Sequence, residues 1–120
     1  MSAVTRPVLL TGASGALGSM HVERLAEAGR ELVLTDIKPF PRALPPRARF
    51  QAADLCDRAA IAELAQGCGA ILHFGGVSTE RPFEEVLGPN ISGLFHIFEA
   101  ARLNEARVVF ASSNHAISSP

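Results

Sequence analysis

The sequence predicts an α/β fold: a doubly wound parallel sheet of strand order 3-2-1-4-5, with helices on both of its faces. Two observations predict it. Short apolar segments alternate with segments of helical spacing along all 120 residues, as strands and crossover helices do around a parallel sheet. In addition, three glycines at G-x-x-G-x-x-G spacing (Gly12, Gly15 and Gly18) join the first apolar segment to the first helical one. We therefore treat residues 1–120 as one domain.

The first strand is expected at Val8–Leu10, a continuous apolar run that suits a strand buried on both faces. The three glycines that follow allow a tight turn, close approach of an anion to bare backbone, and close packing of helix against strand. Helical sequence then runs to Gly29, a residue type favoured as a helix C-cap. Because N–H groups at a helix start attract anions, the turn predicts a dinucleotide site.

The remaining elements follow in order. Further strands are expected at Glu31–Asp36, Arg49–Asp54, Ala70–Gly76 and Arg107–Ser112. Further helices are expected at Asp57–Gly67, with Asp57 as N-cap, and at Phe83–Asn104. The segment Ile37–Ala48 contains four prolines and is interpreted as a crossover loop, and Gly88-Pro89 is expected to split or kink the last helix.

Acidic residues follow the second and third strands, at the sheet edge where such folds bind ligands. Asp36 lies 18 residues after Gly18, where a carboxylate can accept hydrogen bonds from an adenosine ribose. Its charge would repel a 2′-phosphate, which favours NAD over NADP, although Lys38 and Arg42 could accommodate that phosphate. The alternative for Asp36 is a solvated loop acid. Asp54 could hold the edge of the adenine, or could cap a turn.

The serines and histidines give weaker signals. Ser112 and Ser113 follow the fifth strand and could cap a turn, and no G-x-S-x-G elbow surrounds them to indicate a hydrolase. His115 falls in a loop at the ligand edge, where substrate contact and an ordinary loop position are equally compatible with the sequence. The other histidines are expected to be core or surface residues: His21, His73 and His96. No histidine pair has metal-ligand spacing, so no metal site is expected.

Composition excludes several classes of protein. Apolar residues make up 48% and charged residues 19%, which fits a folded domain. The net charge is −1 without a basic run, so neither nucleic acid nor an anionic membrane is an expected partner. No apolar run approaches the ~20 residues of a membrane span. Cys56 and Cys68 form neither a metal motif nor a disulfide framework, which favours the cytoplasm.

Four segments occur in the order typical of one family: TGASGALG, Asp54-Leu55, PNISGLFHIFEAAR and VVFASSNH. Over essentially its whole length the chain resembles the extended short-chain dehydrogenases/reductases, the NAD-dependent sugar epimerases and dehydratases with a Rossmann fold. Within them, GGVSTERPF together with SSNH resembles the uronate dehydrogenases, which oxidise C1 of galacturonate or glucuronate with NAD to an aldarolactone. The resemblance implies NAD as cofactor and a hexuronic acid as small-molecule substrate, and it leaves a homo-oligomer possible.

The resemblance also implies roles by position. The diphosphate would be lined by Gly12, Gly15, Ala16, Leu17 and Gly18. The adenosine would contact Asp36, Ile37, Asp54 and Leu55, with further cofactor contacts at Phe74, Gly75, Gly76 and Asn90, the last matching a helix asparagine that supports a proton-relay water. Ser113 matches the active-site serine that aligns the reacting oxygen, and substrate contacts match Ser78, Ser113, Asn114 and His115.

The sequence departs from the family at the general base. That base is the tyrosine of a Y-x-x-x-K pair after the fifth strand, with its pKa lowered by the lysine and the oxidised nicotinamide. This sequence has no tyrosine, and Lys38 is its only lysine. We expect residues 1–120 to be the N-terminal, NAD-binding half of such an enzyme, truncated before the catalytic helix and the substrate region. Activity of this half alone should be lost, since general-base help is worth about 10²–10⁴-fold.

Three other interpretations are compatible with the sequence. The first is a nucleotide-sugar epimerase or dehydratase, which GGVSTERPF and Asn114-His115 disfavour. The second is a non-catalytic NAD(P)-binding or sensor protein, because regulators with this fold can dispense with the tyrosine. The third is a remnant that folds poorly, because a sheet that ends at its fifth strand exposes an edge and an apolar face. Weak NAD binding and marginal stability are expected in any case.

Overall fold

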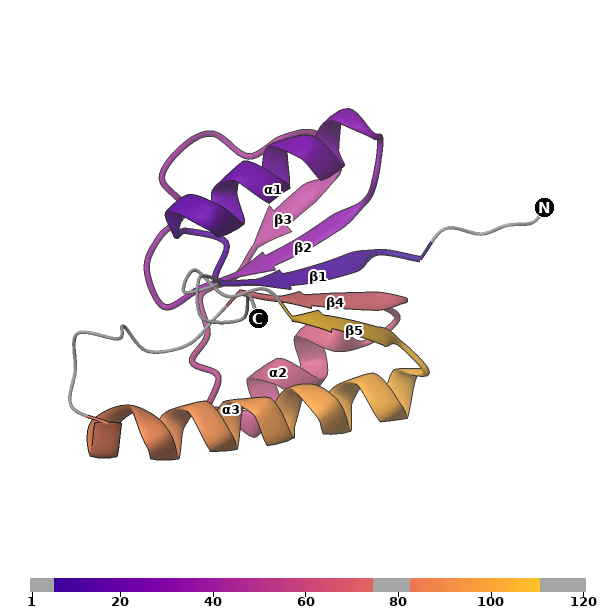
Figure 1. Ribbon diagram of the computed structural model, residues 1–120. Helices are drawn as coiled ribbons and strands as arrows, with labels where there is room; N and C mark the ends of the chain where they lie inside the picture. Colours follow the sequence, from indigo (N-terminus) through magenta and orange to yellow (C-terminus); the bar gives the residue numbers. More distant parts are fainter. Residues whose placement is uncertain (1–5, 75–82, 111–120) are drawn as a thin grey trace, which may run out of the picture.

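The computed structural model describes residues 6–74 and 83–110, with the backbone alone for residues 83–92 and 110. Its elements are β1 (Val8–Thr11), α1 (Ala16–Glu27), β2 (Leu32–Thr35), β3 (Ala48–Phe50), α2 (Arg58–Ala65), β4 (Ala70–His73), α3 (Phe83–Asn104) and β5 (Arg107–Phe110). All neighbouring strands pair in parallel, in the order β3-β2-β1-β4-β5. Helix α1 covers one face of the sheet, and α2 and α3 cover the other (Figure 1). The predicted fold class and strand order are confirmed.

The central strands supply the core on both faces of the sheet. Strands β1 and β2 are buried at all four of their positions, as their apolar sequences VLLT and LVLT require. Because side chains alternate along a strand, successive residues enter opposite cores. The core beneath α1 contains Val8, Leu10, Val22, Leu32 and Leu34. The core beneath α2 and α3 contains Leu9, Val33, Ile61, Leu64, Ile71 and Ile97.

Helix α1 ends at Glu27 with Ala28 as its C-cap, and the expected Gly29 follows directly after that cap. Gly29 has φ +81°, a left-handed conformation that favours glycine. Its N–H donates to the Ala26 carbonyl at 2.9 Å, and the N–H of Arg30 donates to the Leu25 carbonyl at 3.1 Å. These two bonds form a Schellman motif, which satisfies carbonyls at the helix end and directs the chain into β2.

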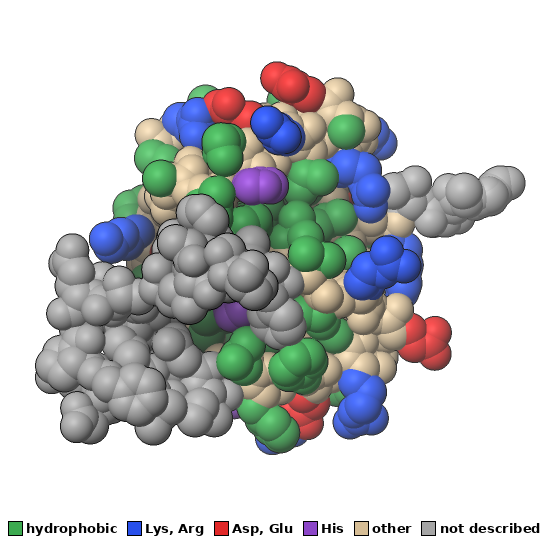
Figure 2. Space-filling model, in the orientation of Figure 1, with side chains coloured by type: hydrophobic (Ala, Val, Ile, Leu, Met, Phe, Trp, Pro, Cys, Tyr) green, Lys and Arg blue, Asp and Glu red, His purple; other side chains and the backbone are tan. Residues whose placement is uncertain are grey.

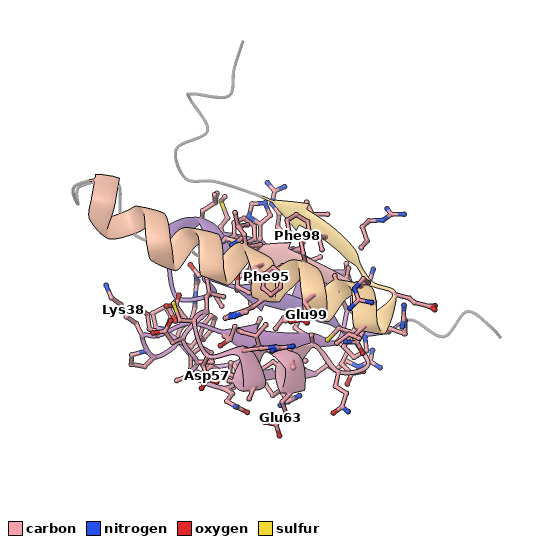
Figure 3. All side chains as sticks on the ribbon, turned by 90° about the horizontal axis from the view of Figure 1, so that it is seen from below. Lys38, Asp57, Glu63, Phe95, Phe98 and Glu99 are labelled. Carbon is pink, nitrogen blue, oxygen red and sulfur yellow. The ribbon has the colours of Figure 1, made fainter. Side chains whose placement is uncertain are left out.

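Helix α2 begins at its predicted cap and is joined to α3 by an ion pair. The Asp57 carboxylate accepts a hydrogen bond from the Ala60 N–H at 3.2 Å. Arg58 of α2 pairs with Glu99 of α3 at 2.8 Å. Figure 3 shows Glu99 on the side of α3 that faces α2 and Phe98 on the side towards β5. Opposite sides of α3 therefore have different neighbours.

Two elements differ from their expected course. Helix α3 is continuous through Gly88-Pro89, so of the expected split or kink the split does not occur. A proline removes one hydrogen bond from the ladder, and a helix of 22 residues can continue on either side of that loss. Strand β3 ends at Phe50 rather than Asp54, although the N–H groups of Gln51 and Ala53 still donate to the carbonyls of Leu34 and Asp36.

Large hydrophobic side chains are exposed on α3 and β5. The exposed fractions are 60% for Phe95, 52% for Phe98 and 43% for Val109. Figure 2 shows hydrophobic side chains gathered near the middle of the viewed face, with most charged side chains around them. Within the described residues, β5 has a single neighbour, β4, and so lies at an edge of the sheet. No helix in residues 6–74 and 83–110 is long and apolar enough to cross a bilayer.

Candidate functional site

The glycine turn links β1 to α1 at the carboxyl edge of the sheet (Figure 1). Gly12 takes a left-handed conformation with φ +70°, which starts the turn. The next residue is anchored to the neighbouring strand, because the Ala13 N–H donates to the Thr35 carbonyl at 3.1 Å. The Gly15 N–H then donates back to the Gly12 carbonyl at 3.2 Å, which closes the turn.

The second and third glycines are required for different reasons. A Cβ on Gly18 would lie 2.1 Å from the Gly12 carbonyl oxygen, so the protein's own backbone excludes a side chain there. A Cβ on Gly15 would meet the same oxygen at 3.6 Å, which is ordinary van der Waals contact. The chain itself therefore tolerates a side chain at Gly15, and the bare backbone there leaves space for a ligand.

The N-terminus of α1 lacks the groups that normally complete a helix start. Gly15 is the N-cap, no side chain caps the first turn, and that turn contains no acidic residue. Its first N–H groups and the positive end of the helix dipole are thus available to an anion. This arrangement fits the diphosphate of a dinucleotide.

Asp36, after β2, braces the glycine turn as well as facing the ligand edge. Its Oδ2 accepts the Ser14 N–H at 3.0 Å, and its Oδ1 accepts the Lys38 N–H at 3.2 Å. The Ser14 hydroxyl donates to the Lys38 carbonyl at 2.9 Å. An ionised carboxylate offers about four acceptor positions, so Asp36 can still accept hydrogen bonds from a ribose. Arg42, which could have favoured a 2′-phosphate, pairs with Glu23.

The loop after β3 lies beside Asp36. The Ala53 N–H donates to the Asp36 carbonyl at 3.1 Å, which joins the ends of β2 and β3. Asp54 is exposed and Leu55 is half-buried, while Ile37 is 70% exposed. An exposed apolar side chain next to an exposed carboxylate suits a planar base with a polar edge. Asp54 also caps its own turn, so both roles considered for it are compatible with its position.

A hydrogen-bonded group that sequence reasoning missed joins β1 to β4. His73 is buried, as expected of a core residue, and its Nδ1 lies 2.8 Å from the Thr11 hydroxyl. That hydroxyl oxygen also accepts the Phe74 N–H at 3.1 Å. Burial lowers the pKa of His73 below its ordinary value. Thr11 and His73 are paired across β1 and β4, and this pairing places their side chains together. It can be recognised only once the register of the two strands is known.

Because of that burial, we expect stability to fall as the pH drops. The unfolded chain protonates its histidine near pH 6.5, whereas the folded chain resists protonation until the pH is lower. Unfolding then takes up a proton, so the His73 contribution is complete above about pH 6.5 and is lost below it, at up to about 1.4 kcal/mol per pH unit. Urea unfolding between pH 7.5 and 5.5 measures this. His73→Asn should show a shallower dependence, and an unchanged slope would contradict the assignment.

His21 and Cys56 lie near the carboxyl edge of the sheet, whereas Cys68 precedes β4 at the opposite edge. His21 contacts the ring of Phe74, with ring centroids 4.9 Å apart. Desolvation and the neighbouring Asp54 raise the pKa of Cys56, and burial raises that of Cys68. Within the described residues, no group of three His, Cys, Asp or Glu side chains could hold a metal ion.

The structure brings one part of the predicted site together and does not describe the rest. The positions that meet at the carboxyl edge are Gly12, Gly15, Ala16, Leu17, Gly18, Asp36, Ile37, Asp54, Leu55 and Phe74. Asn90 lies on α3, where only the backbone is described. The remaining predicted residues lie outside the described residues: Gly75, Gly76, Ser78, Ser113, Asn114 and His115.

Comparison with known proteins identifies the family. The model of the NAD dependent epimerase/dehydratase family matches residues 8–120. The chain belongs to this family. The glycine turn between β1 and α1 lies within the matched residues.

Within the epimerase/dehydratase family, the chain is similar to uronate dehydrogenases. It is 52% identical over 111 residues to the uronate dehydrogenases of Pseudomonas putida and Pseudomonas syringae, covering 92% of this chain. A solved uronate dehydrogenase from Agrobacterium tumefaciens, a tyrosine-to-alanine mutant complexed with NAD, is 44% identical with a TM-score of 0.80 and covers 93% of this chain. The chain spans 41%, 40% and 42% of the length of these three relatives.

Proposed function

We propose that this chain forms the NAD-binding part of an enzyme that oxidises C1 of a hexuronic acid, galacturonate or glucuronate, to an aldarolactone. The observation that carries the proposal is the uncapped N-terminus of α1 at a glycine turn braced by Asp36. The similarity of the chain to uronate dehydrogenases supports the choice of substrate class. Bound NAD would supply the acceptor for the hydride removed from C1.

The described residues have distinct roles in this proposal. N–H groups of the glycine turn and the first turn of α1 bind the diphosphate, since bare backbone is accessible at Gly15. The Asp36 carboxylate accepts from the ribose hydroxyls and repels a 2′-phosphate. Asp54 accepts from the amino group of the adenine, while Ile37 and Leu55 contact its faces. Phe74, held by Thr11, limits the site on the β4 side.

The substrate end of the site involves residues proposed from resemblance alone. Gly75, Gly76 and Asn90 complete the cofactor contacts, and Ser78, Asn114 and His115 bind the hydroxyls and carboxylate of the sugar. Ser113 aligns the reacting oxygen. The 120 residues contain no tyrosine to act as general base. Residues 1–120 by themselves are therefore proposed to bind NAD without measurable turnover.

Two experiments test the cofactor and the substrate parts of this proposal separately. Calorimetry with residues 1–120 should detect binding of NAD and weaker binding of NADP, and NMR should locate the affected amides at Gly12–Gly18. Equal affinity for NADP, or unmoved amides in this turn, would contradict the cofactor assignment. The substrate class is tested by NADH formation with the polypeptide translated from the complete reading frame. Galacturonate or glucuronate should react, and reaction with nucleotide sugars instead would contradict the uronate assignment.

A further inference from the structure

The loop that would hold the adenine is fixed by a helix far along the chain. The Leu55 carbonyl lies 2.7 Å from Nδ1 of His96 on α3, 41 residues later. A carbonyl oxygen only accepts hydrogen bonds, so Nδ1 must carry the proton and donate it. His96 is half-buried, and its ring therefore holds the backbone next to Asp54 in one place.

A second residue on α3 contacts the same loop. Gly93 precedes His96 by three residues, so the two share one face of the helix. A Cβ on Gly93 would lie 3.0 Å from Cβ and 3.4 Å from Cδ1 of Leu55, tighter than ordinary contact. The missing side chain at Gly93 lets α3 approach the loop closely enough for the His96 hydrogen bond. Both contacts converge on Leu55, although neither comes from the elements that flank the loop.

We propose that His96, together with Gly93, positions the adenine-binding loop and so sets recognition of the adenine base. This inference rests on the proposed function, because it assumes that Asp54 accepts a hydrogen bond from the adenine amino group. His96 does not touch the cofactor and is a positioning residue. It acts through Leu55, which follows Asp54 in the chain. The side chain of Asp54 is itself exposed.

The test compares NAD with nicotinamide hypoxanthine dinucleotide, in which an oxygen replaces the adenine amino group. The chain should prefer NAD about tenfold, as expected for one hydrogen bond to a charged group. His96→Leu and Gly93→Ala should bring this ratio close to one. His96→Asn should retain it, because the asparagine Nδ2 lies as far along its side chain as Nδ1 of histidine. Arg102→Gln, exposed on the last turn of α3, is the matched control and should leave the ratio unchanged.

The ratio distinguishes positioning from general loss of structure. A merely destabilised domain binds both dinucleotides more weakly and keeps their ratio, and thermal melting of each variant monitors folding. If His96→Leu does not fold, Gly93→Ala carries the same comparison. An unchanged ratio in a folded His96→Leu or Gly93→Ala variant overturns the inference, as does a wild-type chain that binds NAD without preferring it. A wild-type chain that binds neither dinucleotide overturns the proposed function itself.

Discussion

Replacing Gly18 by alanine is expected to destabilise the domain and abolish dinucleotide binding together. The new Cβ would lie 2.1 Å from the Gly12 carbonyl oxygen and 2.9 Å from its carbon. These are backbone atoms, so no side-chain rotation relieves the clash, and α1 must move away from the turn. Overpacking of this kind costs about 1–3 kcal/mol or more. The gain of about 1 kcal/mol in helix propensity offsets only part of this cost. A lower melting temperature and the loss of the calorimetric NAD signal would show both effects.

Gly15→Ala is the matched comparison in the same turn. Its Cβ would meet the Gly12 carbonyl at 3.6 Å, and its φ of −80° suits any residue. Alanine is a poorer N-cap than glycine, so we expect a stability loss of about 1 kcal/mol. NAD affinity should nevertheless fall about tenfold or more, because the methyl group occupies space needed by the diphosphate. Normal NAD binding by Gly15→Ala would show that the diphosphate does not lie against this turn.

The second large effect is expected at Asp36. Asp36→Asn removes a negative charge that would accept hydrogen bonds from the ribose and repel a 2′-phosphate. Hydrogen bonds to charged groups contribute about 1.5–3 kcal/mol, so NAD affinity should fall about 10–100-fold. NADP affinity should fall less or rise, because the repulsion disappears. Calorimetric titration of both cofactors gives the ratio of their dissociation constants.

Asp57→Asn provides the control for this charge change. Asp57 caps α2 rather than facing the dinucleotide, and asparagine caps a helix about as well as aspartate. The variant should therefore keep the preference for NAD while carrying the same change in net charge. If both variants alter the preference equally, general electrostatics rather than Asp36 governs the choice of cofactor.

Local sequence was sufficient for features that depend on neighbouring residues. The apolar run at Val8–Leu10 predicted a buried central strand, and the spacing of Gly12, Gly15 and Gly18 predicted the turn that follows it. The cap at Asp57 could be predicted because a side chain and an N–H three residues apart meet within one helical turn. Of the split or kink expected at Gly88-Pro89, the split does not occur, because the hydrogen bonds of the remaining turns of this long helix outweigh the local preference of the two residues.

Pairs distant in sequence needed the tertiary structure. Thr11 meets His73 across 62 residues, and Leu55 meets His96 across 41, and neither spacing carries a signal of its own. Asp36 was predicted at the ligand edge from its place after a strand, but its hydrogen bond to the Ser14 N–H depends on how β1 and β2 align.

The sequence by itself thus determined the order of strands and helices and the identity of the glycine turn, because periodicity and backbone sterics act over a few residues. The tertiary structure alone decided which side chains hold the turn and the adenine-binding loop in place. Hydrogen bonds and close contacts between distant segments form only once the sheet register and helix packing bring those segments together.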